Sequence, residues 1–185
     1  MSLASTPIRT AIAELLEGSI GSIRTVTATK FLRGVFDGQP EQATAALTAQ
    51  TSTARHRFDV ELGAFRTHSA SPVSALSNYR IAECDVTIRV KTKLATANQT
   101  TQRATDIAAI LDDCDLAAQA LGRPGNLTQT AGATATNLIG GCLVGPDGSG
   151  TPRIERTDQE WSGPTGMATT LIVGRALVKI SQAVS

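Results

Sequence analysis

The stretch YRIAECDVTIRVKTKL, residues 79–94, decides the fold that we expect for this chain. Apolar and polar side chains alternate along most of it, which is the period of a β-strand with one buried face. At about 3.3 Å per residue the strand extends roughly 50 Å, so we expect it to protrude from its domain or to bend through a bulge. The expected buried residues are Ala82, Cys84, Val86, Ile88 and Val90, and the expected polar residues are Glu83, Asp85, Thr87, Arg89 and Lys91.

The C-terminal residues predict a long β-hairpin. Residues 152–161 and 168–182 are strand-like, and a Gly/Pro-rich turn separates them. Both faces of 168–182 are mostly apolar, which indicates a strand that is central in its sheet or covered on both sides.

Three other segments favour strands. Residues 55–65 alternate apolar and charged side chains, and residues 22–36 are rich in β-branched residues. We also expect a strand within residues 126–144, which ends at the turn 145–150.

Two segments predict amphipathic helices. Residues 6–17 place Ile8, Ile12, Leu15 and Leu16 on one face. Residues 98–121 predict the best helix, with Gly122 as the C′ residue that closes it. Residues 40–54 are compatible with a short helix or a loop. The apolar stripe expected on the second helix is Ala104, Ile107, Ala108, Leu111, Cys114, Ala118 and Leu121.

Together these elements predict one α+β domain over residues 1–185. We expect an antiparallel or mixed β-sheet, helices packed on one of its faces, and the long C-terminal β-hairpin. A chain of 185 residues is long enough to bury a core without disulfides or metals.

Composition and charge exclude several classes of function. The 17 basic and 16 acidic residues give a net charge of +1, so there is no global field that attracts nucleic acid. The N-terminal residues lack the pattern of a signal peptide, and no uninterrupted apolar run is long enough to span a membrane. The three widely spaced cysteines indicate buried thiols in a reducing compartment rather than disulfides. We expect no metal and no cofactor.

No catalytic motif is present in the sequence, and we expect no enzymatic activity. Cys114 is the candidate nucleophile of an enzyme, with His56 or His68 as its base. Cys114 lies on the expected apolar stripe, where burial raises a thiol pKa instead of activating the thiol. We therefore interpret it as a core residue.

Two groups of charged residues carry alternative interpretations. Asp112, Asp113 and Asp115 belong to a solvated helix face, or form an acidic docking patch. The basic row Arg89, Lys91 and Lys93 fits the lining of a channel for a phosphate backbone. It fits better a solvated or ring-interface face on which acids of the preceding strand lie opposite the bases.

The first arm of the hairpin is the most informative segment for interactions. It is mostly charged, and Trp161 stands just before the turn, where it fits either a core position or an interface anchor. The candidate interface residues of this arm are Arg153, Ile154, Glu155, Arg156 and Trp161.

The order of the elements resembles the tail-terminator family of long-tailed bacteriophages. The matching segments are TPIRTAIAELL, the strand NYRIAECDVTIRVKTKL, the helix NQTTQRATDIAAILDDCDLAAQAL and the hairpin PRIERTDQEW…MATTLIVGRALVKI. The resemblance implies a virion structural protein, made in the host cytoplasm, that forms a ring at the head-proximal end of the tail. Its implied partners are copies of itself, usually six, the tail tube protein and a neck or head-completion protein, with DNA passing through the ring.

Three other functions stay open. The chain fits another ring of the neck, such as a head-completion or stopper protein. Less directly, it fits a small cytosolic enzyme or ligand-binding domain, for which a pocket with converging polar groups is expected. It also fits a nucleic-acid-binding module, for which steeply salt-dependent binding is expected.

Overall fold

A single six-stranded β-sheet organises the protein. The computed structural model describes residues 8–9, 11–12, 15–16, 32–34, 56–70, 79–94, 100–128, 138–162 and 165–181. The strand order is β1-β2-β4-β6-β5, and the short β3 also pairs with β4. All pairs are antiparallel except β1 with β2. The strands are β1 (Leu32–Gly34), β2 (His56–Leu62), β3 (Arg66–Thr67), β4 (Tyr79–Leu94), β5 (Arg153–Ser162) and β6 (Thr165–Ser181).

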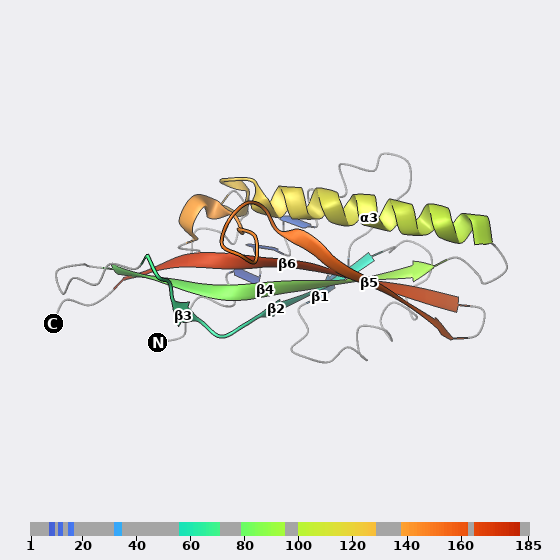
Figure 1. Ribbon diagram of the computed structural model, residues 1–185, viewed down its shortest axis with the longest axis horizontal. Helices are drawn as coiled ribbons and strands as arrows, with labels where there is room; N and C mark the ends of the chain where they lie inside the picture. The colour runs from blue at the N-terminus through green and yellow to red at the C-terminus, as the bar shows by residue number, and fades with distance from the viewer. Residues whose placement is uncertain are drawn as a thin grey trace.

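One long helix, α3 (Thr100–Gly122), lies along one face of this sheet (Figure 1). We call the opposite face of the sheet the outer face. The expected α+β fold, with a mixed sheet and a long C-terminal hairpin, is therefore confirmed.

The pairing of β4 with β6 forms the centre of the sheet. Their register runs without interruption from Tyr79 opposite Ser181 to Leu94 opposite Gly166. The expected bulge in β4 is thus absent, and β6 supports the strand over its whole length. The alternation in β4 is confirmed, because Ala82, Cys84, Val86, Ile88 and Val90 are all buried. The central position of β6 is confirmed too, whereas its outer face is only partly covered.

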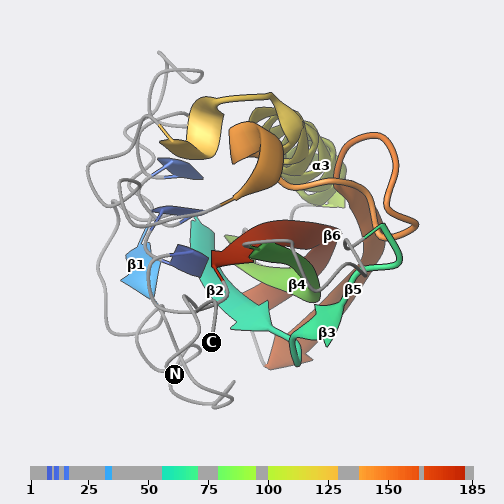
Figure 2. The same ribbon diagram turned by 90° about the vertical axis from the view of Figure 1, so that its left-hand side faces the viewer.

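The core lies between the sheet and the helical residues. In the N-terminal segment, Ile8, Ile12, Leu15 and Leu16 are helical and buried, as expected. Figure 2 shows the N-terminal helical fragments in blue on the side of β1, extending from the level of the sheet toward the level of α3. The rest of the helix expected over 6–17, most of the strand expected over 22–36 and the whole of 40–54 lie outside the described residues.

The rotation of α3 differs from the expected one. Cys114, Ala118 and Leu121 are buried as expected, but Ala104, Ala108 and Leu111 are exposed. The buried stripe instead continues through Ile110 and Ala117. The physical reason is that the alanines at 104 and 108 offer little apolar area, so the larger Ile110 decides which side of the helix faces the sheet.

Gly122 does not act as the expected C′ residue, because it is the last residue of α3 itself. A Cβ atom at this position would lie 2.6 Å from Cγ2 of Thr151, so glycine allows the chain before β5 to pack against the helix end. The left-handed residue of the turn is Gly125, at a φ of 82°.

The prediction of a strand within 126–144 is wrong for the part of this segment that the structure describes. It holds two single 3-10 turns, η1 (Asn126–Thr128) and η3 (Ile139–Gly141), and residues 129–137 lie outside the described residues. Only Leu138 and Val144 form bridges to β6. Gly140 and Gly141 adopt φ values of 75° and 61°, which interrupt an extended backbone.

Candidate functional site

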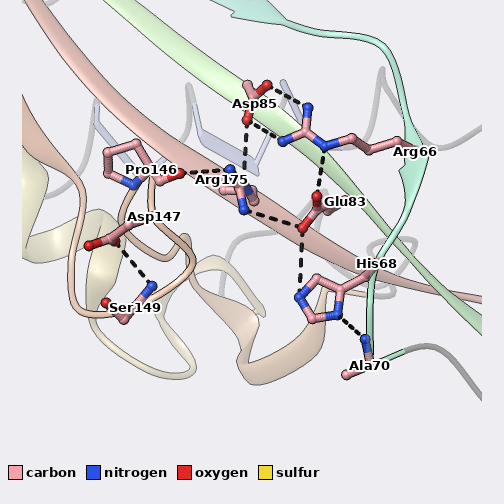
Figure 3. A network of polar contacts seen from close by, with 9 residues as sticks. All are labelled: Arg66, His68, Ala70, Glu83, Asp85, Pro146, Asp147, Ser149 and Arg175. Atoms are coloured by element: carbon pink, nitrogen blue, oxygen red, sulfur yellow. Dashed lines mark hydrogen bonds and ion pairs between the residues drawn. The ribbon is translucent and has the colours of Figure 1, made fainter.

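Five charged or titratable side chains gather on the outer face of the sheet (Figure 3). They are Arg66 on β3, His68 just after it, Glu83 and Asp85 on β4, and Arg175 on β6. Strand register brings them together, because Arg66 lies opposite Glu83 and Asp85 lies opposite Arg175. We call this set the outer-face network.

Each arginine of the network contacts both carboxylates. The Nε atom of Arg66 donates to Oε1 of Glu83 at 2.7 Å, and its two Nη atoms donate to Asp85 at 2.7 and 3.0 Å. The Nε atom of Arg175 donates to Oδ1 of Asp85 at 3.3 Å, and its Nη1 donates to Oε2 of Glu83 at 3.4 Å. The four side chains therefore form a closed set of alternating charges.

Arg175 also ties the network to the turn 145–150. Its Nη2 donates to the carbonyl oxygen of Pro146 at 2.7 Å, and its backbone exchanges hydrogen bonds of 2.8 and 2.9 Å with Val144. The turn itself is held by the bond from the Gly148 amide to the Gly145 carbonyl and by a φ of 87° at Gly148. Figure 3 shows the Pro146 carbonyl facing the guanidinium.

His68 closes the network on the side of β3. The backbone amide of Ala70 donates to Nδ1 of His68 at 3.1 Å, which places the ring proton of the neutral imidazole on Nε2. That nitrogen lies 3.6 Å from Oε2 of Glu83. The histidine thus orients a proton toward a carboxylate that is only 8% exposed.

The electrostatics of the network favour a structural role. Hydrogen bonds from Arg66 hold the pKa of Asp85 below its usual value. Two guanidinium groups face two carboxylates, so the formal charges cancel and no net charge is left to attract an ion. The arrangement joins β3, β4, β6 and the turn 145–150.

All three cysteines are buried, and Cys84 lies on the face of β4 opposite that of Glu83 and Asp85. Burial raises the pKa of Cys114 to about 12, and burial raises the pKa of Cys84 to about 11. The expected place of Cys114 in the core is therefore confirmed. His68 is in the outer-face network, with the sheet between it and Cys114, and the side chain of His56 lies outside the described part of the chain.

The acidic residues of α3 divide into two groups. Asp112 and Asp115 are exposed, and Asp115 accepts a hydrogen bond of 2.7 Å from Gln119. Asp113 is only 2% exposed, so its expected place on a solvated face is wrong. The reason is the rotation of the helix, which turns position 113 toward the buried stripe at 110, 114 and 117.

The basic row on β4 is shorter than expected. Arg89 is partly exposed and lies 3.8 Å from Glu61 on β2, which confirms the expected pairing of opposite charges across the strands. Lys91 is only 7% exposed, so this side chain does not line an open surface of the single chain. The side chain of Lys93 lies outside the described residues.

The hairpin arm β5 is the last strand of the sheet on its side. Arg153 and Glu155 are exposed, and the register shifts between Ile154 and Arg156, so Glu155 occupies a bulge. Ile154 is partly buried against the core. Trp161 pairs through its backbone with Gly166, and its side chain, like that of Arg156, lies outside the described residues.

The outer-face network was not found from the sequence. Two features of the sequence are related to it. Arg175 is the lone arginine in a mostly apolar strand, and Glu83 and Asp85 are acids at successive positions on the polar face of another strand. Nothing in the sequence indicates that Arg66 belongs to the network, because its place there depends on the pairing of a two-residue strand.

Comparison with known proteins adds no family to this picture, since neither a protein-family model nor a curated protein matches the chain. Within the described residues, no group of three or more His, Cys, Asp or Glu is placed to hold a metal ion. Among the described helices, none is long and apolar enough to cross a membrane.

Proposed function

We propose that this protein is a virion structural protein that forms a ring at the head-proximal end of a bacteriophage tail. In this role it caps the tail tube, ends its polymerisation and joins it to the neck. Its partners are further copies of itself, in a ring of six, the tail tube protein and a neck or head-completion protein. DNA passes through the ring, and the protein performs no chemistry.

The apolar outer face of β6 carries this proposal. Leu171, Val173 and Leu177 point away from α3 and are only partly covered. Partly exposed apolar side chains on a rigid sheet favour contact with other protein chains. The outer-face network supports the same role, because charge-balanced ion pairs stiffen a surface and leave no free group for catalysis.

Loss of the protein from assembling particles tests the function. A phage that lacks this gene is grown with and without a complementing copy, and its particles are examined by negative-stain electron microscopy. We expect tails of uncontrolled length that fail to join heads, and tails of normal length when the protein is supplied. A point variant that only removes a surface charge, Arg123→Ala, serves as a matched complementing control.

A different defect would redirect the proposal. Tails of normal length together with heads that leak DNA would assign the protein to another neck ring, such as a stopper. Normal, infectious particles without the protein would overturn a structural role in the virion.

A further inference from the structure

The rotation of α3 leaves one apolar and acidic surface uncovered. Ala108 and Leu111 are exposed one turn apart, and Leu111 keeps 37% of its surface accessible. Asp112 and Asp115 are exposed beside them. We call Ala108, Leu111, Asp112 and Asp115 the acidic ridge. It lies on the side of the helix turned away from the sheet, where its leucine stays partly exposed.

A second surface with matching properties lies on the outer face of the sheet. Leu171 and Val173 of β6 are partly exposed there. Arg89 lies opposite Leu171 on β4, and Arg153 lies opposite Val173 on β5. We call Arg89, Arg153, Leu171 and Val173 the basic seat. Each of its two apolar residues thus has one of these arginines opposite it on a neighbouring strand.

The two surfaces are complementary in charge and in size. Two acids adjoin a leucine on the ridge, and two arginines adjoin a leucine and a valine on the seat. The ridge runs from residue 108 to residue 115 of the helix, about 11 Å, and the seat spans two strand spacings, roughly 10 Å. The Arg89 side chain is 33% exposed and lies 3.8 Å from that of Glu61, which is itself 64% exposed, so part of its guanidinium faces solvent.

The ridge and the seat lie on opposite layers of the molecule (Figure 1). One chain therefore cannot join its own ridge to its own seat. A contact between the ridge of one copy and the seat of the next is a head-to-tail contact, and repeated head-to-tail contacts close into rings or extend into filaments. A ring is the assembly that the proposed function requires.

We propose that the acidic ridge of one copy docks on the basic seat of the next copy, with Asp112 and Asp115 facing Arg89 and Arg153. This inference rests on the proposed function and names the contact through which the ring closes. Leu111 packs against Leu171 and Val173 in this contact. The charged residues orient the copies, and the apolar residues exclude water between them.

Charge exchange between the two surfaces tests the contact. One variant carries Asp112→Arg and Asp115→Arg, and a second carries Arg153→Asp. Sedimentation velocity at low salt measures the association of each variant alone, of their equimolar mixture and of the wild-type chain. Arg123→Asp, which reverses an exposed charge outside both surfaces, is the matched control. Circular dichroism confirms that each variant is folded.

We expect each variant alone to associate roughly tenfold or more weakly than the wild-type chain, because like charges then face each other. The mixture should recover association, since the new arginines of one variant meet the new aspartate of the other. The control should associate like the wild-type chain. Higher salt should weaken the association of the wild-type chain.

Three results would overturn the contact. Either the folded variants associate as strongly as the wild-type chain, or the mixture gains nothing over its components. A wild-type chain that stays monomeric at every concentration would also refute it. These results are separate from the particle phenotype, so the ridge and seat can fail while the role at the tail end stands.

Discussion

The guanidinium of Arg175 reaches the carbonyl oxygen of Pro146 at 2.7 Å, which anchors the turn 145–150 to the middle of the central strand. The same side chain contacts Glu83 and Asp85. Among the five residues of the outer-face network, Arg175 is thus the one whose side chain is described as bonded to this turn. The presence of an arginine in the mostly apolar middle of β6 has a structural explanation in these contacts.

Replacement of Arg175 by leucine should destabilise the protein. The change leaves Glu83, which is 8% exposed, with fewer partners and releases the Pro146 carbonyl. Loss of one partner from a largely buried charged group costs about 2 kcal/mol or more of unfolding free energy. Chemical denaturation of the variant and of the exposed-site control Arg123→Ala measures the difference. Equal stability of the two variants would contradict a supporting role for the network.

The stability of the folded protein should depend on pH through Asp85, a carboxylate of the outer-face network. Its pKa is lowered in the folded protein, chiefly by hydrogen bonds from Arg66, relative to an ordinary value of 3.8. A lowered pKa means that the stabilisation is present above that ordinary value and is lost as the pH falls through the folded-state pKa.

Urea denaturation at a series of pH values measures this effect. We expect the wild-type chain to lose more stability between roughly pH 5 and pH 2 than the variant Asp85→Asn, which has no carboxylate to protonate. Parallel pH profiles for the two proteins would show that Asp85 contributes nothing to the acid sensitivity.

The cysteines should be unreactive in the folded protein. Burial raises the pKa of Cys114 to about 12 and that of Cys84 to about 11, so the thiolate that attacks disulfide reagents is scarce at neutral pH. Titration with a coloured disulfide reagent should detect little reaction of these thiols until denaturant is added. Rapid labelling of Cys114 in the native protein, identified by mass spectrometry, would disprove its burial.

Two glycines near the end of α3 should respond differently to alanine. At Gly122 a Cβ atom would lie 2.6 Å from Thr151, so Gly122→Ala should cost roughly 1–3 kcal/mol of stability through steric overlap, despite the higher helix propensity of alanine. At Gly125 nothing lies within 4 Å of a Cβ atom, and the cost should be about 1 kcal/mol from the φ of 82° alone.

Thermal unfolding of both variants measures these costs. The double variant Gly122→Ala with Thr151→Gly should recover part of the loss, because it removes the nearest side chain, whereas Thr151→Gly should do nothing for Gly125→Ala. A Gly122→Ala variant as stable as the wild-type chain would mean that the packing between α3 and the start of β5 is loose.

Much of the fold could be predicted from local patterns. The alternation in residues 79–94 determines which face of β4 is buried, because successive side chains of a strand point to opposite sides. The Gly/Pro-rich turn predicts the hairpin, and the apolar residues on both faces of 168–182 predict the central place of β6. The strand predicted within 126–144 is wrong, because only two of the apolar residues between its glycines pair with the sheet.

Little of the candidate site could be predicted in this way. The outer-face network joins residues up to 92 positions apart in the chain, and only the register of β3, β4 and β6 brings them within bonding distance. The rotation of α3 was also beyond local pattern, because its first turns carry small alanines and the contact with the sheet depends on Ile110.

The sequence by itself determined the long helix and the long strands of this protein, since helix and strand periods depend on neighbouring residues. The tertiary structure alone decided which charges meet and which apolar side chains remain uncovered. Those outcomes depend on strand register and helix rotation, which are set by packing across the whole domain. Asp113 shows most clearly what the tertiary structure decided: it is buried, although Asp112 and Asp115 of the same acidic run are exposed.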